Sequence, residues 1–127
     1  MENRNYYVEI DECNRELTAR ERIAIKQTDN AIKLDEAVTP EESLTIHPDF
    51  YAILKVHNEA SEDKDYGQYI VIDKDGNKYV TGSGSFFKSF IEIYDEMSQT
   101  DEEYAIEIVK RESKNYKGKF FLTCNII

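Results

Sequence analysis

The chain has 127 residues, 40% of them hydrophobic, which suits one domain built around a single core. Its net charge of −10 argues against a protein that coats nucleic acid through bulk positive charge, so an anionic ligand would need a local basic patch. Because no apolar run approaches about 18 residues and no signal-peptide pattern is present, we expect a cytoplasmic protein without a membrane partner.

Residues 1–43 are expected to form an N-terminal extension of the domain. The segment Thr18-Ala-Arg-Glu21 is a capping-box pattern and favours a short helix, although the apolar residues that follow it alternate as they would in a strand. Residues 6–10 are a candidate additional strand. Residues 35–42 are expected to form a connector.

Three strands are expected in the next part of the chain. Residues 50–57 alternate well enough for a strand, and residues 58–67 follow as an acidic connector without an apolar period. Residues 69–72 and 78–81 then flank Asp73-Lys-Asp-Gly-Asn77. Because Asp-Gly between two apolar runs is a strong turn signal, these segments predict a β-hairpin.

A helix and two further strands are expected after this hairpin. Ser85 ends a Gly-Ser break and is placed to cap a helix, whose apolar residues recur at helical spacing as far as Met97. Residues 104–109 alternate like a fourth strand, and residues 120–127 form a fifth that is apolar on both faces. The turn between these strands is expected at residues 116–118.

The predicted order is strand, strand, strand, helix, strand, strand. This is the element order of an OB-fold, a small Greek-key barrel with a helix between its third and fourth strands. We therefore expect a mainly β (α+β) fold, a five-stranded OB-fold-like Greek-key barrel with one helix between strands three and four. Residues 1–127 would form one domain, with the barrel core at residues 44–127 and the N-terminal extension before it.

A basic and aromatic stretch, residues 110–121, stands out in this acidic chain. It contains five Lys or Arg and one acidic residue, a net charge of +4, so the rest of the chain carries −14. Lysines offer charges for phosphates and aromatic rings offer faces for bases, the combination that holds single-stranded nucleic acid. The candidate contacts in this stretch are Lys110, Arg111, Lys114, Tyr116, Lys117, Lys119 and Phe121.

Other candidate contacts lie on the strands that would build the groove of an OB-fold. They are Tyr51, Lys55, Tyr69 and Tyr79. For Tyr69 and Tyr79 a place in the core is equally consistent with the pattern, because a barrel strand buries one face and the register is not known. The basic stretch also has a simpler interpretation, a solvated turn whose lysines keep a sheet edge soluble.

Two further motifs are better explained by local structure than by ligand binding. The segment Gly82-Ser-Gly-Ser-Phe-Phe-Lys-Ser89 resembles a phosphate-binding loop, but Phe87 occupies the position of its second glycine. A side chain there obstructs the backbone that would wrap the phosphates. The segment Asp73-Lys-Asp-Gly-Asn77 lacks the glycine and glutamate spacing of a calcium loop, so a hairpin turn is expected there.

The histidines and cysteines do not suggest a catalytic or metal site. His47 and His57 have no nearby cysteine or patterned carboxylate partner. Cys13 and Cys124 lie far apart without a CxxC or Cys/His pattern, so we expect two reduced structural thiols. We therefore expect no enzymatic activity, no metal and no cofactor.

Four parts of the sequence together are similar to a known family. They are Leu17–Arg22, Asn30–Glu36, Val80–Ser83 with Phe86–Met97, and Ser113–Lys119 with Phe121–Cys124. This set resembles small single-stranded-DNA-binding proteins of phages and mobile elements of Gram-positive bacteria. The resemblance implies an OB-fold, no catalysis, and binding to exposed strands during replication, recombination or transfer. It implies contacts at Lys114, Tyr116, Lys117, Lys119 and Phe121.

The leading hypothesis from the sequence is therefore single-stranded DNA binding with little sequence preference. RNA as the ligand, a homodimer, and replication or recombination proteins as partners all stay open. The alternative is an acidic protein-interaction or inhibitor module that presents its carboxylates to a basic host protein. Its motivation is the charge of −14 outside the basic stretch.

Overall fold

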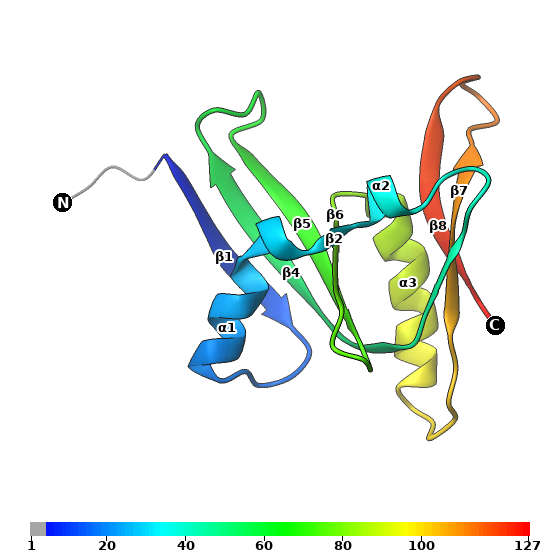
Figure 1. Ribbon diagram of the computed structural model, residues 1–127, viewed down its shortest axis with the longest axis horizontal. Helices are drawn as coiled ribbons and strands as arrows, with labels where there is room; N and C mark the ends of the chain where they lie inside the picture. Colours follow the sequence, from blue (N-terminus) through cyan, green and yellow to red (C-terminus); the bar gives the residue numbers. More distant parts are fainter. Residues whose placement is uncertain (1–4) are drawn as a thin grey trace. The chain divides into compact units, whose positions relative to one another are not determined.

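The computed structural model describes residues 5–127, which form a mixed α+β fold made mostly of strands (Figure 1). The chain divides into two compact units, each built from two separate stretches. The first unit contains the chain up to Ile32 together with Asp49–Gly82. The second unit contains Lys33–Pro48 together with Ser83–Ile127. Segments far apart in the sequence are thus combined in each unit.

The first unit is built on a five-stranded sheet with the strand order β1-β4-β5-β6-β2. Its strands are β1 (Tyr6–Cys13), β2 (Ile32–Lys33), β4 (Pro48–Asn58), β5 (Asp65–Asp73) and β6 (Lys78–Thr81). The four strands predicted in this part of the chain are confirmed, and β5 begins earlier, inside the predicted acidic connector. β1 pairs antiparallel with β4, and a bulge between Ile10 and Glu12 shifts their register.

An apolar cluster covers one face of this sheet and includes the helix α1 (Ala19–Lys26). Alternate residues of β4 supply much of it, because successive side chains of a strand point to opposite faces. The buried members are Ile25, Phe50, Ala52, Leu54, Ile70 and Val80. α1 begins at the predicted capping box, in which Thr18 and Glu21 each accept the other's backbone N–H. A short 3-10 helix, Thr28–Asn30, follows α1.

The connection between β5 and β6 is the tight turn predicted from its Asp-Gly pair. Gly76 has a φ of +87°, a conformation that glycine adopts without strain. Asp73, only 5% exposed, accepts the backbone N–H groups of Asp75 and Asn77 at 3.0 and 2.8 Å and the hydroxyl of Tyr79 at 3.1 Å. Burial acts to raise the pKa of the Asp73 carboxyl, but these bonds outweigh it and hold that pKa below its ordinary value.

The second unit contains a three-stranded sheet with the order β3-β7-β8. Its elements are α2 (Leu34–Ala37), β3 (Leu44–Ile46), α3 (Gly84–Met97), β7 (Ile106–Glu112) and β8 (Phe120–Ile126). The predicted helix and the last two strands are confirmed, although β7 begins later than expected and takes in Lys110 and Arg111. The connector expected at residues 35–42 begins instead within α2.

α3 lies beside β8 and bonds to its backbone (Figure 1). The expected helix cap was Ser85, but Ser83 is the residue whose hydroxyl accepts a backbone N–H of the first turn. Ser85 instead donates its hydroxyl to the carbonyl of Leu122 at 2.8 Å. Ser89 accepts the N–H of Cys124 at 3.1 Å. Two helix serines therefore satisfy backbone groups of β8, which lies at the edge of its sheet.

From β4 onward the observed element order matches the prediction, but a closed barrel is not confirmed. The strands belong to two sheets that do not close into one, and β1, β2 and β3 add to the five strands of the predicted barrel. The N-terminal extension contributes β1 directly to the larger sheet. The division into one domain with a core at residues 44–127 stays a prediction.

Candidate nucleic-acid interface

The basic stretch forms the end of the β7–β8 hairpin. The two strands pair antiparallel as far as Glu112, which lies opposite Phe120. One more pair follows, because the N–H of Ser113 donates to the carbonyl of Lys119 at 2.8 Å. We refer to residues 113–119 as the basic loop. The predicted turn at residues 116–118 lies within it, and the paired strands fix both of its ends.

Three aromatic side chains are exposed at this end of the hairpin. Tyr116 is 65% exposed, Phe120 is 48% exposed and Phe121 is 39% exposed. Because side chains alternate along a strand, Phe120 shares a face with the buried Leu122, whereas Phe121 points to the opposite face. The rings are therefore presented on both faces of the hairpin and on its loop.

Four cationic side chains accompany these rings. They are Arg111, Lys114, Lys117 and Lys119, and all four are exposed. Among residues 5–127, none of the four lies within ion-pair distance of a carboxylate. Arg111 lies directly opposite Phe121 in the strand register, so a cation and a ring are neighbours on one face. These charges are thus available to an anionic ligand.

Lys110 differs from the other predicted contacts of the basic stretch. Its ammonium group donates to the backbone carbonyl of Asp35 in α2 at 2.8 Å. It lies opposite the buried Leu122, on the other face of the hairpin from Arg111. The structure therefore gives Lys110 a role in anchoring α2, and we leave it out of the proposed contact set.

The predicted contacts on the earlier strands belong to the first unit, whereas the basic loop belongs to the second. Tyr51 is 9% exposed and Tyr79 is 6% exposed, so neither ring offers a face to a base. Burial raises the pKa of Tyr79 to about 12, assisted by its bond to Asp73. Tyr69 is half-buried. Tyr51 and Tyr79 therefore pack inside the first unit. For Tyr79 this is the core position that the sequence pattern had left open as an alternative.

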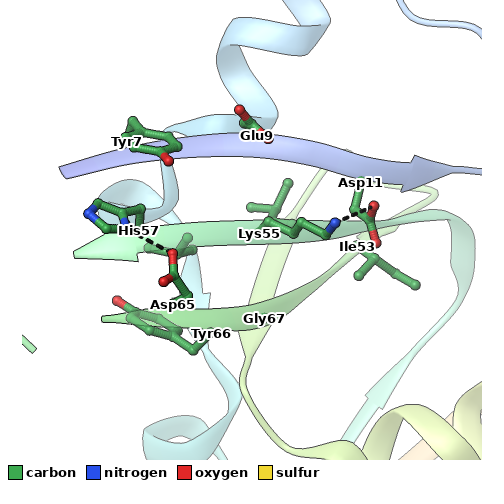
Figure 2. A pocket seen from close by; sticks show the side chains of 11 residues that line it. Tyr7, Glu9, Asp11, Ile53, Lys55, His57, Asp65, Tyr66 and Gly67 are labelled. Carbon is green, nitrogen blue, oxygen red and sulfur yellow. Dashed lines mark hydrogen bonds and ion pairs between the residues drawn. The ribbon is translucent and has the colours of Figure 1, made fainter. Parts of the chain in front are cut away.

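Lys55, the remaining predicted contact, lies in a hollow of about 400 Å³ lined by β1, β4 and β5. Figure 2 shows its ammonium group directed toward Asp11, and the two groups are 3.5 Å apart. Glu9, Asp11 and Asp65 bring three carboxylates to this hollow, against the two basic side chains Lys55 and His57. A phosphate would be repelled by that excess of negative charge. Lys55 is therefore a poor phosphate ligand here.

His57 forms the most connected polar cluster of this hollow, which no pattern in the sequence indicated. Its Nδ1 lies 2.7 Å from Asp65, its Nε2 is bonded to Glu59, and its ring stacks on Tyr7 with centroids 5.0 Å apart. Hydrogen bonds to Asp65 and Glu59 raise the pKa of His57 above its ordinary value. The prediction that this histidine has no carboxylate partner is wrong, because the β4–β5 connection brings the acidic connector back beside it.

Metal and thiol chemistry have little support in the described residues. Residues 5–127 contain no group of three or more side chains that could hold a metal ion. Cys13 and Cys124 are both free thiols, as expected. Burial raises the pKa of the Cys124 thiol, which also disfavours its reactive thiolate form.

Comparisons with known proteins identify no relative. No protein-family model, no curated protein and no solved structure matches this chain. Within residues 5–127, none of the helices has the length and apolar character needed to cross a membrane.

Proposed function

We propose that this protein binds single-stranded DNA, without catalysis and with little sequence preference, through the end of the β7–β8 hairpin. The observation that supports this most is the presence, on one structured hairpin, of exposed rings and of cations that have no ion-pair partner among residues 5–127. The rest of the chain is strongly acidic, so this site is an exception that composition does not explain.

The proposed contacts divide into two kinds. Arg111, Lys114, Lys117 and Lys119 neutralise phosphates, and each neutralised phosphate steepens the salt dependence of binding by about 0.7 in slope. Tyr116, Phe120 and Phe121 stack on bases, each worth about 1–3 kcal/mol. Stacking does not read base edges, which is why little sequence preference is expected.

The strand pairing supports an OB-like arrangement as part of this proposal. Residues 44–58 pair first with β7, through β3, and then with β5, through β4. β4, β5 and β6 follow one another in the sheet, and β7 returns after α3 to lie beside β3. A fourth strand that returns beside the first defines a Greek key, the topology of OB-folds. The resemblance to single-stranded-DNA-binding proteins of phages and mobile elements implies the same function, in replication or recombination.

The proposal is tested by fluorescence anisotropy of a labelled oligothymidine at several salt concentrations. We expect binding at low salt that weakens as salt increases. Tyr116→Ala should weaken binding at all salt concentrations, whereas Lys117→Ala should mainly flatten the salt dependence. Tyr6→Ala removes a ring that is 52% exposed on β1 and should leave binding unchanged. Absence of binding even at low salt would reject the proposal.

The acidic hollow beside His57 favours a second candidate function, an interaction module for a basic protein. Glu9 lines this hollow, and no described residue forms an ion pair with it. An arginine side chain could bind there through its charge and by contact with the half-buried rings of Tyr7 and Tyr66. This function would be favoured over DNA binding by two results together. The protein should bind an arginine-rich peptide, more weakly in Glu9→Gln, and it should not bind oligothymidine.

A further inference from the structure

The only carboxylate of the basic stretch is used inside the hairpin. Glu112 is the last residue of β7, and its Oε2 accepts the backbone N–H of Gly118 at 2.9 Å. Gly118 has a φ of +82°, a left-handed conformation that other residues rarely adopt. Glu112 therefore bonds to the point at which the basic loop turns back toward β8.

Backbone bonds close the same loop from within. The N–H of Lys119 donates to the carbonyl of Tyr116 at 3.1 Å, and the N–H of Ser113 donates to the carbonyl of Lys119 at 2.8 Å. Both bonds are made by Lys119, the residue that follows Gly118. The bond from Glu112 is the only one to a side chain in the described part of this loop, and a carboxylate acceptor makes it stronger than a neutral one.

We propose that Glu112 is a positioning residue that holds the basic loop in its ligand-binding shape, a role that rests on the proposed function. The geometry supplies the reason for an acidic residue in a basic site. Glu112 lies opposite Phe120, on the face away from Arg111 and Phe121. Its charge opposes phosphate binding, and its hydrogen bond orders Tyr116, Lys117 and Lys119.

These two effects have opposite signs and can be separated by substitution. Glu112→Gln removes the charge and keeps an oxygen that can accept the Gly118 N–H. Glu112→Ala removes both the charge and the acceptor. If charge alone mattered, both variants would bind oligothymidine more tightly, by about twofold to fivefold. If Glu112 positions the loop, only the Gln variant should bind more tightly.

The first measurement is therefore the affinity of the full chain and its variants for oligothymidine over a salt series. We expect Glu112→Ala to bind about fivefold more weakly than Glu112→Gln, the factor that corresponds to one hydrogen bond between uncharged groups. Glu103→Gln makes the same charge change in the exposed segment before β7 and should leave the affinity unchanged. Equal affinities of the Ala and Gln variants would overturn the positioning role.

The second measurement needs no DNA. Hydrogen exchange of the Gly118 amide should be slow in the unmodified protein and in Glu112→Gln, and fast in Glu112→Ala. Fast exchange in the unmodified protein would overturn the positioning role even if DNA binds. The Gly118 amide could exchange slowly in the unmodified protein and fast in Glu112→Ala while the protein does not bind DNA. That result would reject the proposed function and support the loop-holding role of Glu112.

Discussion

The ends of two strand pairs in this protein carry charge in opposite ways. At the end of β4 and β5, His57 is bonded to Asp65 and Glu59, and Lys64 lies 3.4 Å from Glu59. At the end of β7 and β8, the four exposed cations have no carboxylate within ion-pair distance in residues 5–127. The first end pairs its basic side chains with its own carboxylates, whereas within residues 5–127 the second end supplies no such partner for its cations.

This difference in pairing distinguishes the two strand ends more clearly than their charge content does. Both ends contain several ionisable side chains, and both appear as charged turns in the sequence. Lys55 and Arg111 are each exposed cations on strands, yet Lys55 is paired with Asp11 whereas Arg111 lies opposite the ring of Phe121. Pairing within the fold, rather than charge alone, decides which cation can neutralise a phosphate.

The largest effect is expected from two neighbouring residues of β8. Leu122→Ala should lower the free energy of unfolding by about 2–5 kcal/mol, because the side chain is buried and its removal leaves a cavity. Phe121→Ala should change stability little but weaken oligothymidine binding by about 1–3 kcal/mol. Chemical denaturation and anisotropy measure the two quantities. A Phe121→Ala variant that is strongly destabilised but still binds oligothymidine would contradict the binding role of Phe121.

The next largest effect concerns the β5–β6 turn, where the Asp73 carboxylate accepts hydrogen bonds that stabilise the fold. Asp73→Ala should lower the free energy of unfolding by about 1–3 kcal/mol at neutral pH, because the turn's backbone N–H groups and the buried Tyr79 hydroxyl lose their acceptor. The pKa of Asp73 is lowered, so its contribution is present above the ordinary pKa and is lost as pH falls through the folded value. The cost of the substitution should therefore shrink in acid. Asp75→Ala, in the same turn but exposed, is the matched control.

A smaller effect is expected when the two exposed strand cations are compared directly. Arg111→Ala should reduce the salt slope of oligothymidine binding by about 0.7, because one phosphate loses its partner. Lys55→Ala removes a cation already paired with Asp11 and should leave the slope unchanged. Affinities for oligothymidine measured over a salt series give the slopes of the two variants. Equal losses in the two variants would show that internal pairing does not govern binding.

The smallest effect is a pH dependence of stability that arises from His57, at the end of β4 and β5. The pKa of His57 is raised, so its stabilising contribution is complete below its ordinary pKa of 6.5 and is lost as pH rises through the folded value. Unfolding measured from pH 6 upward should show this loss, and His57→Gln should abolish it. His47→Gln, which removes an exposed histidine of the second unit, should keep it. A pH dependence unchanged by His57→Gln would contradict the assignment.

The elements that the sequence predicted well depend on local signals. The capping box at Thr18 and Glu21 formed the start of α1, and the Asp-Gly pair formed the β5–β6 turn with Gly76 in a left-handed conformation. These features depend on residues within a few positions of one another. The helix cap is Ser83 rather than the predicted Ser85, since either serine suits a cap by its residue type. The hydrogen bond from Ser85 to Leu122 depends on the tertiary structure.

The features that the sequence left open depend on pairing between distant segments. The burial of Tyr79 and the exposure of Phe121 follow from strand register, since a shift of one residue exchanges the two faces of a strand. The partners of His57 were missed because Asp65 reaches it only when β5 lies beside β4. Barrel closure was expected from element order, which does not specify how strands pair at the edges of a sheet.

The sequence by itself determined the chemistry of this protein, an acidic chain with one basic and aromatic stretch, and the order of the strands β4, β5, β6, β7 and β8 around α3. Only the tertiary structure decided which of those charges are already neutralised. It paired Lys55 with Asp11 and Lys110 with a backbone carbonyl, and among residues 5–127 it left Arg111 and the lysines of the basic loop without a carboxylate within ion-pair distance. The physical reason is that electrostatic interaction depends on distance in space, and folding brings together residues that lie far apart in the chain.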